Sequence, residues 1–351
     1  MTFCVVCGAS GFIGKALVDR LAESGFAGQA VSRRRMTNLP LQWTWQPRDV
    51  VLRTPVSLSG VSCISPTASG DRDVVLVHLE VKHHAVDPRK AEIAEFQAVN
   101  VEGVRHWLNW CDTAEVLRIV YFSTVKAISA SSHCQDELAD GDPSTLYGQS
   151  KREAERLVSD WASRCSKRAA LILRPAVVYG PGNQGNMFLL VECLARRRFF
   201  LIGRGENVKS LVSLRNLCAA TVFLMQRMQP GLEVFNIVDR QTFSFRDISQ
   251  MIARLMGVRW SERSLPLGLV RGLAWGGDLI SRLAGSFPLT TSRLEALTES
   301  AHFSCAKLLA KGFCHPQTTE DGLRELIEWY KNRDQASTSA AFAVQSISAK
   351  S

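Results

Sequence analysis

The sequence predicts an α/β protein built on a doubly wound parallel sheet, with a smaller C-terminal lobe that binds substrate. A glycine-rich segment at residues 8–14 lies between a short apolar run and a stretch with helical apolar spacing. Further short apolar runs alternate with helical patterns along the first half of the chain. Such alternation is typical of a parallel sheet with helices on both faces, which binds its ligand at the carboxyl ends of the strands.

The individual elements follow from local patterns. Strands are expected at residues 3–7, 29–32, 73–78, 117–122 and 169–173, and helices at residues 12–22, 93–108 and 147–158. We therefore expect a dinucleotide-binding domain over residues 1–181. Residues 182–333 lose this rhythm and predict mainly a substrate-binding lobe, with some segments returning to the first domain. The Ser- and Ala-rich residues 334–351 are expected to form a flexible tail.

Composition narrows the class of protein. Of 351 residues, 46% are hydrophobic and 21% charged, which excludes a disordered or fibrous chain. The net charge of +9 favours anionic partners, but no base-reading motif is present, so we expect no nucleic-acid partner.

The cellular compartment is predicted from the cysteines and the apolar stretches. Ten cysteines spread over a long chain favour a reducing, cytoplasmic compartment. Arg271, Asp278 and Arg282 interrupt the most apolar stretch, so no membrane span is expected, although peripheral association is compatible with the sequence.

The glycine loop predicts a dinucleotide site. Gly8 allows a tight turn, Gly11 lets the backbone approach a pyrophosphate, and Gly14 permits close helix packing. Ser10, Phe12 and Ile13 belong to the same predicted cofactor loop.

The next strand ends without the acidic residue that usually binds the adenosine ribose. That position reads Ser32-Arg33-Arg34, and Arg33 is our first choice for a contact with a 2′-phosphate. The predicted cofactor is NADP or NAD, with a weak preference for NADP. A solvated basic turn is the alternative interpretation.

Tyr147 and Lys151 stand four residues apart, on one face of a helix. An ammonium group near a phenol favours the phenolate, so Tyr147 is a candidate proton shuttle with a lowered pKa. Ser123 and Thr124 follow a buried strand and are candidates for binding the reacting oxygen, with a turn or capping role as the alternative.

Together these motifs resemble the extended short-chain dehydrogenases/reductases, in the nucleotide-sugar branch of the NAD-dependent epimerase/dehydratase family. The likeness also covers F-Q-A-V-N-V-E-G at 96–103, L-R-P-A-V-V-Y-G-P-G at 173–182 and E-D-G-L at 320–323. It implies that Thr124 binds the reacting oxygen, that Tyr147 is the acid/base, and that Lys151 binds the nicotinamide ribose.

The same resemblance implies further contacts. Near the cofactor it places Leu79, Asn100, Pro175 and Val178, and for the substrate it adds Ser123, Asn186, Lys209 and Arg293 to Thr124 and Tyr147. The implied reaction is hydride transfer at the 4-position of a nucleotide-linked sugar, as a 4-epimerase or a 4-keto reductase. A homodimer is also implied.

Several residues depart from the family pattern. Glu80 follows His78-Leu79 where relatives have alanine, and it could repel the cofactor; the usual Gly-Asp-Leu segment is not recognisable between residues 39 and 73. His78, His83 and His84 lack a matching ligand pattern, so no metal is expected. The alternatives are a steroid- or flavonoid-type alcohol dehydrogenase/reductase and a non-catalytic dinucleotide-binding sensor.

Overall fold

The computed structural model describes residues 2–48, 73–82, 90–129, 131, 133–260, 263–284, 291, 294 and 298–348. The chain divides into two compact units. Unit 1 comprises Met1–Ala176, Leu214–Val238 and Ala301–Pro316, and unit 2 comprises Val177–Ser213, Asp239–Ser300 and Gln317–Ser351.

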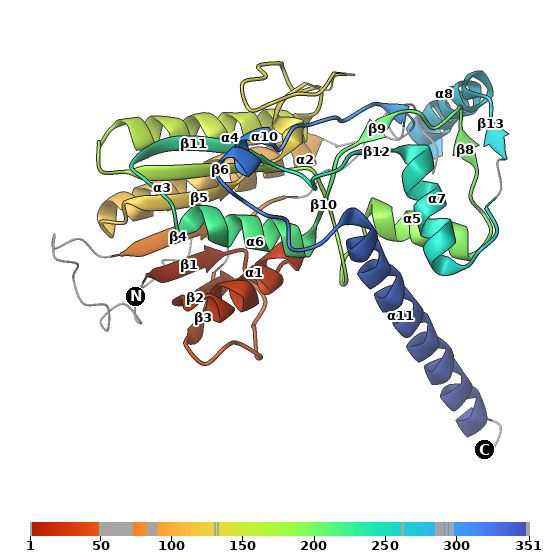
Figure 1. Cartoon of the computed structure of the whole chain (residues 1–351), viewed down its shortest axis with the longest axis horizontal. Helices are drawn as coiled ribbons and strands as arrows, with labels where there is room; N and C mark the ends of the chain where they lie inside the picture. Colours follow the sequence, from red (N-terminus) through yellow and green to blue (C-terminus); the bar gives the residue numbers. More distant parts are fainter. Residues whose placement is uncertain are drawn as a thin grey trace. The chain divides into compact units, whose positions relative to one another are not determined.

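Unit 1 contains a seven-stranded sheet in the order β11-β6-β5-β4-β1-β2-β3, in which every pair is parallel (Figure 1). The strands are β1 (Phe3–Cys7), β2 (Ala27–Ser32), β3 (Trp43–Pro47), β4 (Val74–His78), β5 (Arg118–Phe122), β6 (Ala169–Pro175) and β11 (Gly231–Ile237). The predicted doubly wound parallel sheet is therefore confirmed.

Helices cover both faces of this sheet. They are α1 (Phe12–Glu23), α2 (Lys90–Phe96), the π-helical η2 (Gln97–Glu102), α3 (Gly103–Thr113), the short 3₁₀ segment η3 (Val125–Ala127), α4 (Leu146–Ser163), α6 (Leu214–Met225) and α10 (Ala306–Ala310). Trp107 on α3 and Trp161 on α4 pack with alternate side chains of the strands on one face, while α1 and α6 contact each other on the opposite face (Figure 1). Because both faces are covered, the inner strands β1, β4, β5 and β6 are mostly apolar and buried, whereas the edge strand β3 is partly exposed.

Unit 2 is smaller and mainly helical. Its elements are β7 (Val177–Tyr179), α5 (Asn186–Ala195), β8 (Leu201–Ile202), β9 (Val208–Lys209), β10 (Leu211–Ser213), β12 (Phe243–Ser244), α7 (Phe245–Met256), β13 (Ser264–Leu265), α8 (Leu267–Ala284) and α11 (Thr319–Ser348). The strands form the pairs β10–β7, β12–β9 and β13–β8.

The core of unit 2 lies between α5, α7 and α11 and surrounds Tyr179. The Tyr179 hydroxyl donates to the Asp239 carboxylate over 2.9 Å, and Thr319 Oγ1 donates to the same carboxylate. A Cβ on Gly322 would lie 2.8 Å from the Tyr179 hydroxyl, so only glycine lets α11 approach this closely. This contact explains the glycine of the E-D-G-L motif.

Two segments differ from the sequence-based expectation. Strand β3 forms within a region where no pattern was recognised, because its pairing with β2 supplies the order that the local sequence lacks. Helix α11 continues to Ser348, through part of the predicted flexible tail. From Leu323 to Ser348 this helix contains no glycine or proline, and that composition is compatible with helix.

Candidate active site

The glycine loop joins β1 to α1 and has a geometry that requires its glycines. Gly8 has a φ of +81°, and a Cβ there would lie 2.8 Å from the carbonyl carbon of Leu79. A Cβ on Gly14 would lie 2.4 Å from the Gly8 carbonyl oxygen. Side chains at these positions would push α1 away from the ends of β1 and β4.

The amino terminus of α1 is open for an anion. Its N-cap residue is Gly11, which supplies no side-chain cap, and the first turn contains no acidic residue. The predicted contacts Ser10, Phe12 and Ile13 lie in or beside this turn and are half-buried. A helix end with exposed N–H groups and a positive dipole fits a pyrophosphate, so the residues present fit the predicted dinucleotide.

The carboxyl end of β2 carries Arg33, as the sequence predicts. The Ser32 hydroxyl is occupied locally, since it donates to the Arg34 carbonyl over 2.7 Å and accepts from the Trp45 indole over 3.1 Å. Arg33 itself is exposed at this edge of the sheet. No acidic side chain occupies this turn, so its charge favours a phosphate.

Asn100 connects the loop after β4 to the helix that carries Tyr147. Its Oδ1 accepts from the Lys82 backbone over 2.8 Å, and its Nδ2 donates to Ser150 Oγ over 3.0 Å. Ser150 Oγ in turn donates to the Tyr147 carbonyl over 2.8 Å. Asn100 lies in the π-helical segment η2, an irregularity often found at functional sites.

Thr124 and Tyr147 come together at the carboxyl end of β5. Thr124 is buried, and its side chain forms a hydrogen bond with that of half-buried Tyr147. Gly148 makes this possible, because a Cβ there would lie 2.2 Å from the Lys126 carbonyl oxygen in the segment that follows Thr124. Two residues that the sequence selects separately, Thr124 and Tyr147, are therefore in direct contact.

The protonation of Tyr147 differs from the sequence-based expectation. Burial raises the pKa of Tyr147 to about 12, and the hydrogen bond from Thr124 only partly opposes this shift. The expected lowering by Lys151 does not occur in this structure, because the Lys151 ammonium group donates to the Phe122 carbonyl and the Tyr121 hydroxyl. Tyr147 is therefore a phenol at neutral pH, ready to give a proton.

Lys151 lies one helical turn after Tyr147 on α4 and is almost fully buried. Its Nζ donates to the Phe122 carbonyl over 2.6 Å and to the Tyr121 hydroxyl over 3.1 Å. Desolvation lowers the pKa of Lys151 to about 7, while the negative charge of Glu155 raises it. Tyr121, which no sequence pattern selects, therefore helps to fix the position of the Lys151 ammonium group by accepting its hydrogen bond.

Ser123 belongs to a buried ionic network. Its hydroxyl donates to Glu155 over 2.6 Å, and Arg174 donates to the same carboxylate through Nε at 2.9 Å and Nη2 at 2.7 Å. The Ser123 hydroxyl is therefore engaged by the Glu155 carboxylate. Of the two adjacent hydroxyl residues, it is Thr124 that forms the hydrogen bond with Tyr147.

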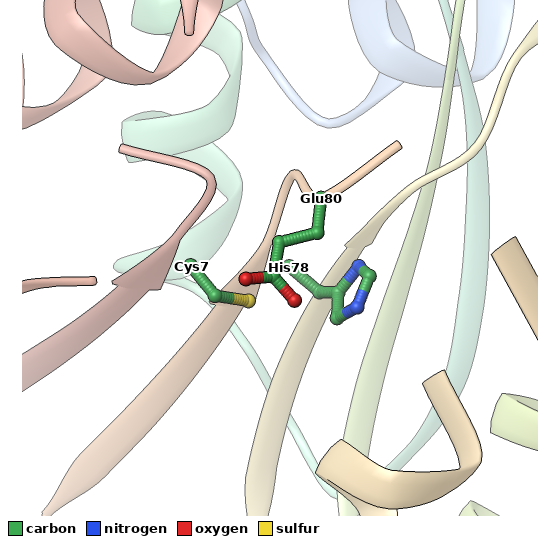
Figure 2. A group of neighbouring side chains, drawn as sticks. All are labelled: Cys7, His78 and Glu80. Atoms are coloured by element: carbon green, nitrogen blue, oxygen red, sulfur yellow. The ribbon is translucent and has the colours of Figure 1, made fainter. Parts of the chain in front are cut away.

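Among the described residues, one buried cluster combines side chains that can bind metals: Cys7, His78 and Glu80 (Figure 2). Their ligand atoms lie within 4.8 Å of one another. Burial and the positive charges of Lys151 and Arg48 lower the pKa of His78 well below its usual value. The same two cations disfavour an added metal ion.

The carboxylate of Glu80 is turned into the protein interior. Glu80 is 8% exposed, and the Trp107 indole donates to its Oε2 over 2.7 Å. The guanidinium of Arg48, at the carboxyl end of β3, lies 4.0 Å from the centre of the Trp107 ring. The Glu80 side chain is therefore held in the interior of unit 1 by Trp107.

The remaining predicted residues lie in different places. Pro175 is buried at the carboxyl end of β6 in unit 1. In unit 2, Val178 is half-buried in β7, Asn186 is exposed at the first residue of α5, and Lys209 donates to the Glu299 carbonyl. Arg293, like His83 and His84, lies outside the described residues.

The matching family model covers residues 4–237 and is described as the NAD dependent epimerase/dehydratase family. The chain belongs to this family. The glycine loop and the fold agree with its cofactor class, NAD or NADP.

Two curated relatives match this chain along most of its length. The chain is 25% identical over 329 residues to N-acetyl-alpha-D-glucosaminyl-diphospho-ditrans,octacis-undecaprenol 4-epimerase of Escherichia coli O157:H7, covering 93% of this chain and 94% of the relative. It is 24% identical over 259 residues to UDP-glucose 4-epimerase of Vibrio cholerae, covering 72% and 75%.

A solved structure shares the fold. UDP-glucuronic acid 4-epimerase from Bacillus cereus, in complex with NAD, matches with a TM-score of 0.72 at 16% identity, covering 94% of this chain and 99% of that one. Within the described residues, no helix is long and apolar enough to cross a membrane.

Proposed function

We propose that this protein is an NAD(P)-dependent 4-epimerase of a sugar joined through a diphosphate to a carrier. The observation that carries the proposal is the Thr124–Tyr147 hydrogen bond at the carboxyl end of β5, with buried Lys151 one helical turn after Tyr147 and bonded to the Phe122 carbonyl of the same strand. The 4-position is supported by the names of two relatives that match along most of the chain.

The residues divide the chemistry between them. Thr124 orients the reacting sugar oxygen and the Tyr147 phenol, and Tyr147 exchanges the proton of that oxygen. A bound NAD(P) would supply the hydride chemistry, taking a hydride from C4 of the sugar and returning it to the opposite face of that carbon.

The acid step is already favourable in this structure. With a pKa of about 12, Tyr147 holds the proton that a sugar keto group must receive when the alcohol is re-formed. The opposite step needs a phenolate, and a positive charge beside the phenol favours that form. We assign this charge in the liganded enzyme to Lys151, one helical turn after Tyr147 on α4, because its pKa of about 7 lets it change charge near neutrality.

The cofactor contacts are proposed by the same reasoning. Gly8, Gly11 and Gly14 would hold the pyrophosphate, Arg33 a 2′-phosphate, and Lys151 the nicotinamide ribose. Asn100 would keep the neighbouring loop in place. In unit 2, Asn186 and Lys209 would contact the substrate diphosphate.

The experiment compares wild type with Tyr147→Phe on a UDP-linked N-acetylhexosamine and on the same sugar linked through a diphosphate to polyprenol. Wild type is expected to form the C4 epimer without net consumption of dinucleotide. Tyr147→Phe should lose at least about 10²-fold in turnover, as removal of an acid/base group does, while binding dinucleotide normally.

Two other results of this experiment would assign the protein a different function. Net reduction of one NAD(P)+ for each 4-keto sugar formed would indicate a 4-keto reductase running in reverse and would refute the epimerase. Unchanged biological activity of Tyr147→Phe would favour a dinucleotide-binding sensor.

A further inference from the structure

Helix α8 of unit 2 has a buried face and an exposed face of unusual composition. Val270 and Ala274 on the buried face pack with Leu294, and Ile202 of β8 and Leu265 of β13 contact the same cluster. The helix is thereby attached to the β8–β13 strand pair (Figure 1).

The opposite face of α8 is apolar and open. Leu269 and Leu273, one turn apart, are each 57% exposed, and Trp275 is 72% exposed. We call these three residues the α8 face. A row of glycines at 268, 272 and 276 runs between the leucines and the tryptophan.

The row of glycines faces open space. Among the described residues, no atom outside the helix's own backbone and the glycines' chain neighbours lies within 4 Å of a Cβ built on any of the three glycines. From Leu267 to Gly277, Arg271 is the one charged side chain. An exposed helix face made of leucine, tryptophan and glycine marks an interaction site rather than an ordinary solvated surface.

Basic residues lie on α8 and beside the two strands to which it is attached. Arg271 is exposed on α8 itself, Arg263 is exposed directly before β13, and Arg204 is exposed shortly after β8, where it also pairs with exposed Glu206 over 3.9 Å. We call these three residues the arginine rim. Between residues 257 and 277 the sequence has three arginines and a single acid, Glu262.

This combination identifies the chemistry of the partner. Leucine and tryptophan side chains beside arginines are typical of helices that lie in the plane of a bilayer interface, with the apolar side at the acyl boundary. Arginines near such a surface attract anionic lipid headgroups. A partner protein or a second copy would have to match the apolar face but would not require the positive rim.

We propose that the α8 face docks on an anionic lipid bilayer, with the arginine rim on the headgroups, and that the sugar substrate is carried on a membrane lipid diphosphate rather than on a nucleotide. The second clause rests on the proposed epimerase function, whereas the first stands on the geometry of α8. The Escherichia coli relative, which is 25% identical over 93% of this chain, is named as a 4-epimerase of an undecaprenol-diphosphate-linked sugar, which agrees with such a carrier.

The docking test is flotation of the full-length protein with vesicles of phosphatidylcholine and phosphatidylglycerol, compared with phosphatidylcholine alone. Wild type should bind the anionic vesicles at least tenfold more tightly, and binding should weaken as NaCl rises from 0.1 to 0.5 M. Leu273→Glu/Trp275→Ser should lose at least tenfold in binding. Leu138→Glu is the matched control, because Leu138 is 88% exposed and lies outside α8.

Three results would overturn the docking proposal, provided that circular dichroism shows all variants folded. They are failure of wild type to float, equal binding by the double variant and the control, and sedimentation as a dimer that the double variant converts to monomer. The last result would assign the α8 face to a second copy.

The carrier is tested separately by activity. Leu273→Glu/Trp275→Ser should lose at least tenfold in turnover on polyprenol-linked sugar in vesicles, yet keep wild-type turnover on a water-soluble short-chain isoprenyl diphosphate sugar. If the wild-type enzyme epimerises the UDP-sugar but neither isoprenyl-linked sugar, the proposal of a lipid carrier is refuted. If no substrate is epimerised, the proposed function fails while the flotation result still decides the docking.

Discussion

The buried Glu155–Arg174 pair offers the sharpest test of how unit 1 supports its active site. Glu155→Ala removes a carboxylate that accepts two hydrogen bonds from Arg174 and one from Ser123. The two charged side chains are only 6% and 5% exposed, so the variant leaves the Arg174 charge buried without its main partner. Breaking one side of such a pair costs about 3–5 kcal/mol of unfolding free energy.

The assay is urea unfolding at pH 7.5, followed by the fluorescence of the buried tryptophans of unit 1. Glu23→Ala is the matched control, because Glu23 pairs with Arg20 at side-chain exposures of 64% and 46%. An exposed pair of this kind contributes about 0–1 kcal/mol.

A second variant separates charge burial from packing. Glu155→Leu/Arg174→Met replaces the pair by apolar side chains of similar size and should recover most of the lost stability, because the buried Arg174 charge is removed together with its partner. The reasoning would be refuted if Glu155→Ala cost no more than Glu23→Ala, or if the double variant were less stable than Glu155→Ala.

Three further predictions concern the site itself. Gly148→Ala must move α4 by about 1 Å away from the Lys126 carbonyl, and should reduce kcat/KM roughly 10²-fold in a turnover assay with dinucleotide affinity unchanged; wild-type turnover would contradict the packing argument. Because burial lowers the pKa of Lys151 from 10.5 to about 7, the folded chain binds fewer protons than the unfolded chain between these values, so wild type should gain stability relative to Lys151→Met as pH rises from 7 to 10; parallel thermal-melting curves would exclude this. Arg33→Asp should shift cofactor preference from NADP towards NAD by at least tenfold in titrations of both dinucleotides, and an unchanged ratio would remove Arg33 from the site.

The sequence was most informative where function and fold depend on neighbouring residues. The glycine loop, the Ser123-Thr124 pair and the Tyr147/Lys151 spacing each follow from a short pattern beside an apolar strand. In a parallel sheet the carboxyl ends of the strands share one edge, so these local patterns predict a common site.

Contacts between distant segments could not be predicted in this way. The Trp107–Glu80 hydrogen bond and the stacking of Arg48 on Trp107 join residues that only the folded sheet brings together. For the same reason the sequence predicts a lowered pKa for Tyr147, whereas burial raises it. Helical spacing places Lys151 on the correct face, but Tyr121 and the depth of burial decide where its ammonium group lies.

The position of β11 has a consequence for synthesis of the chain. Strand β6 is buried along its whole length and pairs with β11, which lies more than 50 residues later in the sequence. Until residues 231–237 leave the ribosome, the nascent chain presents β6 as an apolar, unpaired edge, the type of surface on which aggregation begins. The cofactor-binding sheet is thus completed only after most of the polypeptide has been made, and a fragment ending at residue 181 would lack the strand that closes it.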